Sequence, residues 1–480
     1  MNDKRLLLLF LILVSSCQNP QEATPANLTA NLKEVGINAV GLTFSDVSLE
    51  AHSSQNTVTI RCSVYFNDGP INVRQFGYCF SETDSLPQLS SSGAQQVTAP
   101  FPNRFGSTNA LEATLTNLKR GQTYFVDPYV ILENGDVLYG RFNFADRLSR
   151  FDHKAIAFQL PQRPALQPAQ LVNRSKVPTP VVSDGSMPIP NYHQFITLRG
   201  RLYSFYPSGE LTAYDALADQ WTPQQSLGQS VFAMSPIVFA ANDKLYVHAT
   251  KNYWYPTGKE PMMWEYDPKR NTWTNLGQKA AENLFNSFYQ LSAENNAYFV
   301  NTFPFQTLSF DTQQNQTTAI DKPVLRANRG STPYYLASDG DFYNAIPLNV
   351  NNGQGTVSEQ IVRYDLDTDH IEEESTLQKT LAQQGYTNYS FLMPVGSELF
   401  VGLGSANNLL VQPGSVRARG ILYRDELVQY SLSDRRTITY YDLPGLSDND
   451  QRFALLPLTV NNRLYVFNRT TGALTEIFLK

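Results

Sequence analysis

Three aromatic side chains stand together at one place in the chain where they could bind a ligand. Tyr253, Trp254 and Tyr255 follow one another between Lys251 and Pro256. Adjacent aromatic rings on a loop can stack on a sugar ring or anchor a protein partner, because they combine a large apolar area with a polar edge. The alternative is that this loop packs its own rings against neighbouring strands.

Two pairs of arginines are the other binding candidates. Arg326 and Arg329 lie in one connecting segment, and Arg417 and Arg419 lie in another. A guanidinium group can bind a carboxylate through two parallel hydrogen bonds, so closely spaced arginines could bind an acidic ligand. The alternative is that these arginines are ordinary solvated surface residues.

Residues that could support catalysis or bind a metal are scarce. Asp365, Asp367 and Asp369 alternate as in a cation-binding loop, but the segment lacks the glycine and the distal glutamate of a calcium loop. The five histidines show no metal-ligand spacing, and no nucleophile elbow or phosphate-binding loop stands out. We therefore expect no metal and no cofactor, and we favour a binding protein over an enzyme.

The composition indicates a folded, β-rich protein. Of the 480 residues, 42% are hydrophobic and 17% are charged, which excludes a disordered chain. The 37 basic and 43 acidic residues give a net charge of −6, so the composition lacks the excess of basic residues that is typical of nucleic-acid-binding proteins. The 26 Tyr and 28 Phe, with 27 Gly and 28 Pro, favour strands joined by many turns.

The N-terminus carries a targeting signal. A basic pair, Lys4 and Arg5, precedes an apolar run over residues 6–14, and Ser-Ser-Cys17 follows. The run is shorter than the roughly 20 residues that span a bilayer. It resembles a bacterial lipoprotein signal peptide, which implies removal of residues 1–16 and a lipid on Cys17 as the contact with the membrane. Gln18 after the cysteine favours the outer membrane, facing the cell surface or the periplasm. The alternative is an ordinary secretory signal.

A first β-domain is expected over residues 35–147, after a flexible tether at 17–34. Residues 58–66 alternate between apolar and polar side chains, as a half-buried strand does. The spacing Leu115-x-x-Leu118-x-x-Gly121-x-x-Tyr124 is typical of a tyrosine corner between sandwich strands. The region resembles the fibronectin type III-like domains of lipoproteins from Bacteroidetes-type bacteria.

Two cysteines, Cys62 and Cys79, fall on neighbouring predicted strands of this domain. An exported protein can oxidise such a pair to a disulfide. They could equally remain two buried thiols that pack as small apolar side chains. The sequence leaves both possibilities open.

An internal repeat occupies residues 150–480. Six tight polar turns each lead into a short apolar strand, a Tyr-Asp pair or its equivalent follows in five of the repeats, and Trp221 and Trp273 lie seven residues after the first two Tyr. The pattern resembles a kelch-type β-propeller, although the Gly-Gly pair of that family is missing. The resemblance implies six four-stranded blades. The expected fold is therefore all-β, a β-sandwich followed by a six-bladed kelch-type propeller. Each repeat begins at one aromatic anchor: Tyr203, Tyr246, Tyr298, Tyr343, Phe400 and Tyr465.

The last repeat lacks a fourth strand, so we expect the segment 153–160 to supply it and close the ring. Length variation is concentrated between the second and third strands of the repeats, and these connections share one face of a propeller. The longest are 249–261, 344–360 and 403–425.

We therefore expect a lipid-anchored protein that binds an extracellular protein or glycan through this face. The alternative is a carbohydrate-active enzyme, an isomerase or hydrolase, with its site at the centre of the propeller.

Overall fold

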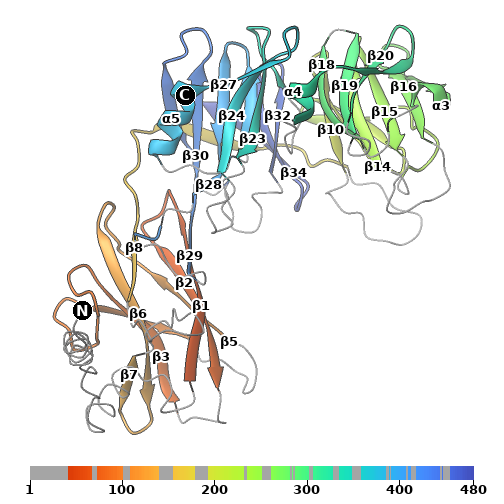
Figure 1. Ribbon diagram of the computed structural model, residues 1–480. Coiled ribbons are helices and arrows are strands. Elements are labelled where there is room, and N and C mark those ends of the chain that lie inside the picture. Colours follow the sequence, from red (N-terminus) through yellow and green to blue (C-terminus); the bar gives the residue numbers. More distant parts are fainter. Residues whose placement is uncertain are drawn as a thin grey trace, which may run out of the picture. The chain divides into compact units, whose positions relative to one another are not determined.

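The computed structural model divides the chain into two compact units, which are described separately (Figure 1). Unit 1 comprises residues 1–50, 56–161 and 409–420, and unit 2 comprises residues 51–55, 162–408 and 421–480. Unit 1 thus continues past the boundary expected near residue 150 and takes in a short segment from the middle of the repeats. The described residues are 42–66, 73–100, 109–139, 155–178, 193–231, 235–250, 261–281, 284, 287–293, 295–301, 306–327, 335–348, 358–384, 389, 391–406, 409–411, 418–443, 446 and 455–480.

Unit 1 is built from two antiparallel sheets. Val58, Ile60 and Cys62 on β2 are buried, while Arg61 between them is exposed, so the alternation in the sequence gives a half-buried strand as expected. The first sheet has the order β29-β1-β2-β5, with β29 Ala418–Tyr423, of which residues 418–420 belong to unit 1, β1 Leu42–His52, β2 Val58–Phe66 and β5 Asn109–Leu115; β28 Ser405–Ala406, which pairs with β29, belongs to unit 2. The second has the order β4-β3-β6-β7 with β8 also beside β6: β4 Gln95–Ala99, β3 Val73–Ser81, β6 Thr123–Leu132, β7 Val137–Tyr139 and β8 Ile156–Gln159.

The tyrosine corner is confirmed. Tyr124 is buried at the start of β6, and its hydroxyl accepts a hydrogen bond from the backbone nitrogen of Lys119 at 2.8 Å. The same hydroxyl donates to Glu82 at 3.0 Å. Tyr124 therefore fixes the corner through which the chain enters β6.

Cys62 and Cys79 are both free and buried, so the disulfide does not form. The sulfur of Cys62 accepts a hydrogen bond from the Tyr78 hydroxyl at 3.1 Å across the two sheets. Cys79 follows Tyr78 directly on β3, and consecutive side chains of a strand point to opposite faces. Cys79 accordingly packs with Tyr129 and Tyr139 in a separate cluster. The two thiols lie on opposite faces of the second sheet, which explains why they do not pair.

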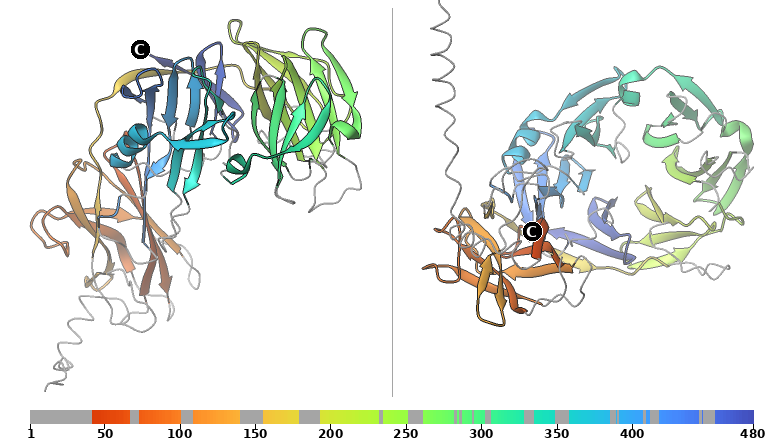
Figure 2. Two further views of the ribbon diagram at one scale, coloured as in Figure 1. Left: turned by 45° about the horizontal axis from the view of Figure 1, so that its top comes forward. Right: turned by 60° about the horizontal axis from the view of Figure 1, so that its bottom comes forward.

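Unit 2 is a ring of six four-stranded blades, as the repeat predicts, and Figure 2 shows the blades arranged around a common centre. The first strands of successive blades contact one another around the ring, and the last, β32, contacts the first, β10. Blade 1 consists of β10 Gln194–Leu198, β11 Arg201–Phe205, β12 Leu211–Asp215 and β13 Gln220–Pro223. Blade 2 consists of β14 Ser235–Ala241, β15 Lys244–Thr250, β16 Met262–Asp267 and β17 Thr272–Leu276. Blade 3 consists of β18 Ser287–Ala293, β19 Asn296–Asn301, β20 Thr307–Asp311 and β21 Gln316–Ile320. Blade 4 consists of β22 Tyr335–Leu336, β23 Phe342–Leu348, β24 Ser358–Asp365 and β25 His370–Glu373. Blade 5 consists of β26 Phe391–Val395, β27 Glu398–Gly402, β30 Glu426–Ser431 and β31 Ile438–Asp442. Blade 6 consists of β32 Leu455–Val460, β33 Arg463–Asn468, β34 Ala473–Leu479 and β9 Gln167–Asn173. Three short helices, α3 Gly277–Ala280, α4 Pro323–Ala327 and α5 Ser375–Gln383, follow the outer strands of blades 2, 3 and 4.

The ring closes with a different strand from the one expected. β9, at residues 167–173, pairs antiparallel with β34 and completes blade 6. The expected closing strand, 153–160, instead forms β8 of unit 1, where it pairs with β6. The physical reason is burial: β8 is almost wholly buried, whereas β9 has the exposed, polar character of an outer blade strand. The apolar segment was therefore the wrong candidate for an outer edge.

Blades 1, 2 and 4 are each held to the crossover before them by the same set of hydrogen bonds. In blade 1 the Tyr214 hydroxyl donates to Asp219 at 2.8 Å, and Asp219 also accepts from the backbone nitrogen of Ser175 at 2.9 Å. Asp219 has a φ of 51°, a left-handed conformation that Asp and Asn tolerate better than other side chains. Asn271 and Asp369 repeat both bonds in blades 2 and 4. The indole nitrogen of Trp221 adds a bond to the Ser175 carbonyl at 3.0 Å, which explains the Tyr-Asp and Trp pattern.

Among the described residues, no helix is long and apolar enough to cross a membrane.

Candidate functional site

The propeller has two ends that differ in character. The turns between first and second strands, and those between third and fourth strands, share one end, here called the turn face. The connections between second and third strands and the crossovers between blades share the other, here called the loop face. On the turn face, Asp215 accepts hydrogen bonds from the backbone nitrogens of Leu217 and Ala218, and Asp267, Asp311 and Asp365 close equivalent turns.

These bonds decide the role of the three alternating aspartates. Asp365 accepts bonds from the backbone nitrogens of Asp367 and Thr368 and from the Thr368 hydroxyl, and the last of these is the main cause of its lowered pKa. Asp369 accepts a hydrogen bond from the Tyr364 hydroxyl at 2.7 Å. Because the carboxylates of Asp365 and Asp369 are engaged by groups of the turn, the blade and the preceding crossover, these two aspartates stabilise the blade. No set of three or more His, Cys, Asp or Glu suited to a metal is found in the described part of the chain.

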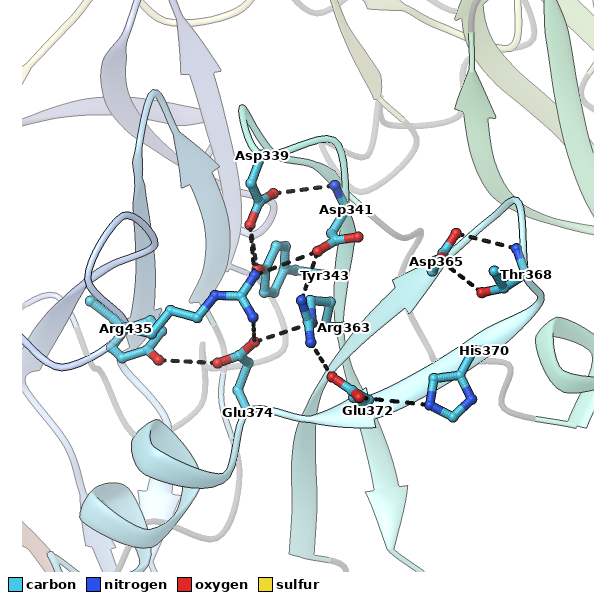
Figure 3. A network of polar contacts seen from close by, with 11 residues as sticks. Asp339, Asp341, Tyr343, Arg363, Asp365, Thr368, His370, Glu372, Glu374 and Arg435 are labelled. Atoms are coloured by element: carbon cyan, nitrogen blue, oxygen red, sulfur yellow. Dashed lines mark hydrogen bonds and ion pairs between the residues drawn. The ribbon is translucent and has the colours of Figure 1, made fainter.

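A network of charged residues covers the turn face of blades 4 and 5 (Figure 3). Arg363 pairs with Asp341 at 3.1 Å, with Glu372 and with Glu374 at 3.6 Å. Arg435 reaches Asp339 at 3.4 Å. Partnered carboxylates raise the pKa of Arg363 despite the burial that opposes this effect. Every charge in the network has an opposite partner, so this surface is not a ready site for an ionic ligand.

Within the network, the hydrogen bonds between blade 5 and the preceding crossover differ from those of blades 1, 2 and 4. In blades 1, 2 and 4, the left-handed residue of the turn between the third and fourth strands is Asp or Asn. In blade 5 this residue is Arg435, with a φ of 53°. The acceptor for the Tyr430 hydroxyl is supplied by the preceding crossover, where Glu374 accepts at 3.1 Å. Glu374 is buried just before α5, and Arg435 lies 3.9 Å from it. In blade 5, therefore, the acidic acceptor lies in the crossover, and a basic residue occupies the turn position.

The predicted binding residues do not form one described site. Tyr253, Trp254, Tyr255, Arg329 and Arg417, with the lipidation candidate Cys17, lie outside the described residues. Arg326 is half-buried in the last turn of α4, in unit 2. Arg419 is exposed on β29, and residues 409–420 belong to unit 1. The described members of the two arginine pairs therefore belong to different units.

The expected long loop 403–425 is largely not a loop. It contains the paired strands β28 and β29, and residues 418–420 of β29 belong to the first sheet of unit 1. The hairpin is tightly packed, because a Cβ on Gly420 would lie 2.8 Å from Leu410. Leu409 and Leu422 are fully buried. The prediction that this segment is a free binding loop is wrong, since its second half forms an ordered strand.

A buried polar cluster lies at the end of that segment, within unit 2. Asp425 is fully buried, accepts a bond from the Ser54 backbone nitrogen at 3.1 Å and another from the Ser54 hydroxyl, and lies 3.5 Å from Nδ1 of His52. Serine, histidine and aspartate together suggest a catalytic triad. In a triad, however, the histidine stands between the other two, whereas here both Ser54 and His52 contact the same carboxylate. The cluster is therefore structural.

The loop face carries several polar residues at strand ends that the sequence analysis missed. His193 precedes β10 and His248 lies near the end of β15; both are buried, and burial lowers their pKa values to about 4 and about 3. Glu359 lies at the start of β24, where burial raises its pKa although it accepts a bond from the Tyr389 backbone nitrogen at 2.8 Å. Arg469 occupies the β33–β34 turn. The spacing between these residues in the sequence is irregular, so only the alignment of the repeats could have grouped them.

No family model and no curated protein sequence matches the chain. Solved structures of β-propeller-like proteins resemble it. A protein of unknown function from Bacteroides thetaiotaomicron is 9% identical, covering 92% of this chain and 99% of that one, with a TM-score of 0.37. TolB from Acinetobacter baumannii is 10% identical over 75% of this chain and 77% of its own, with a TM-score of 0.31. YCF48 bound to D1 peptide is 10% identical over 66% and 97%, with a TM-score of 0.34. The similarities concern the fold alone.

Proposed function

We propose that this chain is an exported lipoprotein, anchored through Cys17 at the outer membrane, whose propeller binds an extracellular protein or glycan on the loop face. The observation that carries the proposal is the contrast between the two faces. Apart from 403–425, which contains β28 and β29, the second-to-third strand connections range from four residues, 469–472, to eleven residues, 251–261. The turns on the opposite face are short and closed by their own aspartates. Variable segments on a rigid scaffold are the usual location of binding residues.

The polar residues of the described loop face support binding rather than catalysis. Among the described residues, neither His193 nor His248 has an ion pair. Nδ1 of His193 lies 2.7 Å from the Ser204 hydroxyl, but both side chains are buried, and Nε2 of His193 has no hydrogen-bond partner, so no acidic group orients the ring as in a catalytic triad. Both histidines are held neutral by burial. The described strand ends therefore present a scaffold with a few polar groups, as binding surfaces do. A carbohydrate-active enzyme remains the alternative that the experiment below must distinguish.

The test uses the soluble chain beginning at residue 18, applied to a glycan array and to surface proteins of the producing cell. We expect stable binding of one class of ligand without turnover of the bound glycan. The matched variants are Glu359→Gln on the loop face and Asp215→Asn on the turn face. Loss of binding only in the turn-face variant, or release of shortened or isomerised sugars by the wild type, would contradict the proposal.

The anchor is tested separately. Cys17→Ala should leave the protein unprocessed or release it from the membrane fraction, because the thiol is the proposed site of lipid attachment. Metabolic labelling with a fatty-acid analogue measures this directly. A Cys17→Ala variant that still carries label and sediments with membranes would contradict the anchor.

A further inference from the structure

Arg469 is a half-buried basic residue of the propeller. It follows β33 in the tight turn of residues 469–472, at the loop face of blade 6. Its side chain is half-buried, and its Nε atom is buried without a hydrogen-bond partner. No ion pair to Arg469 is found among the residues that the structure describes. A buried guanidinium nitrogen without an acceptor is unfavourable unless a ligand supplies one.

Four other arginines differ from Arg469 in their partners. Arg163, Arg174, Arg199 and Arg363 each contact a carboxylate, and these partners raise their pKa values. The pKa of Arg469 is instead lowered, mainly by burial, with a smaller opposing effect from Tyr335. Arg469 therefore experiences desolvation without the counter-charge that the other arginines have.

Arg469 interacts electrostatically with Tyr335, and the surroundings of Tyr335 are aromatic and apolar. Tyr335 begins β22, the innermost strand of blade 4, at the loop-face end, and it packs against a cluster that includes Phe391 and Leu455 at the corresponding ends of β26 and β32. Leu336, the next residue on β22, is 54% exposed. A cation near a phenol ring can bind a ligand with one negative group and one apolar face.

We propose that Arg469 binds the carboxylate of an acidic sugar residue, with Tyr335 beside the sugar ring, and that the ligand of this protein is an acidic glycan. The inference deepens the proposed function and rests on it. A guanidinium fork matches a carboxylate in shape. One unpaired arginine suits a singly charged group, and the net charge of −6 disfavours a dense polyanion such as an acidic peptide segment.

The test compares Arg469→Gln with the matched control Arg436→Gln, an exposed arginine in the β30–β31 turn on the turn face. The probes are arrayed oligosaccharides that contain glucuronate or galacturonate, their neutral glucose and galactose counterparts, and acidic peptides. We expect the wild type to bind an acidic oligosaccharide and not its neutral counterpart. Arg469→Gln should weaken this binding at least tenfold, Arg469→Lys should weaken it less, and Arg436→Gln should leave it unchanged.

Unfolding temperatures separate loss of binding from loss of folding. Because Arg469 is half-buried without a partner, Arg469→Gln should unfold at the same temperature as the wild type or higher. Equal binding of acidic and neutral glycans, or acidic binding that survives Arg469→Gln, would overturn the inference while the proposed binding function stands. Binding of acidic peptides through Arg469 would overturn the choice of a glycan. Binding of no arrayed glycan or peptide would overturn the inference, and capture of a surface protein would then leave the proposed function standing.

Discussion

The two buried histidines of the loop face should make the propeller sensitive to mild acid. His248 is fully buried on β15 between Ile237 and Met263 of the adjacent strands, and neither ring nitrogen has a hydrogen-bond partner. Burial lowers the pKa of His248 from 6.5 to about 3, and that of His193 from 6.5 to about 4. Below pH 6.5 the unfolded chain binds protons at these residues and the folded chain does not. Stability is therefore fully present above this pH and is lost as the pH falls.

The expected loss can be worked out from these values. Between pH 7.5 and pH 5, a histidine with a pKa of 6.5 when unfolded and about 3 when folded loses about 2 kcal/mol of stabilisation. His193, with a folded pKa of about 4, loses nearly the same amount. Together they account for about 4 kcal/mol, a large part of the 5–15 kcal/mol that usually stabilises a domain.

Tryptophan fluorescence during urea unfolding measures this effect, because all four tryptophans fall in unit 2. The free energy of unfolding of the wild type should fall between pH 7.5 and pH 5 by about 4 kcal/mol more than that of the double variant His193→Gln/His248→Met. His370, whose side chain is 65% exposed, provides the control, and His370→Gln should keep the wild-type pH dependence. The reasoning is refuted if the double variant and the wild type lose the same free energy.

Three further changes test the packing of the two units. Deleting residues 167–173 removes the outer strand of blade 6 and displaces Arg174 from its contact with buried Glu476, so unit 2 should unfold at a clearly lower temperature in calorimetry; an unchanged transition would contradict ring closure by β9. Glu374→Ala should destabilise unit 2 by about 1–3 kcal/mol, because the Tyr430 hydroxyl loses its acceptor, and Glu374→Gln should destabilise it less. Equal stabilities of the wild type and Glu374→Ala in urea would contradict the role of Glu374 as this acceptor. A Cys17→Ala chain denatured without reductant should show two reactive thiols with Ellman's reagent, and none would indicate that Cys62 and Cys79 pair after all.

The repeat could be recognised from the sequence because its pattern comes from local chemistry. The Tyr-Asp pair is visible because the tyrosine hydroxyl bonds a left-handed Asp or Asn five residues later and the aspartate closes the turn between them. Trp221 is visible because its indole nitrogen bonds the preceding crossover. These bonds fix the spacing of seven residues from Tyr to Trp. Blade number and register therefore follow from the sequence.

The closing strand and the fifth-blade segment could not be predicted in the same way. An outer blade strand is exposed, so β9 lacks the apolar alternation that marks a strand, whereas the buried strand β8 has it. Residues 403–425 lengthen one connection, and their length alone does not say that they contain the paired strands β28 and β29. Both errors concern pairing between segments far apart in the sequence.

The candidate site was missed for a related reason. Arg469, Glu359 and the two buried histidines belong to different blades, and only the ring brings their strand ends to one face. Burial lowers the pKa of Arg469, and Tyr335, which opposes this effect, is more than a hundred residues away in the chain. The sequence favoured Tyr253, Trp254 and Tyr255 instead because they are adjacent, and they stay a prediction.

Hydrogen exchange of the ligand-bound chain is the measurement that most directly tests the loop face as the binding surface. The strongest ligand from the array or the surface-protein capture would be added to the soluble chain, and amide protection would be compared with the free form. We predict added protection at the starts of β22 and β24 and in the turn 469–472, with none in the turn 216–219. Protection confined to the turn 216–219 and its equivalents on the turn face would contradict the account.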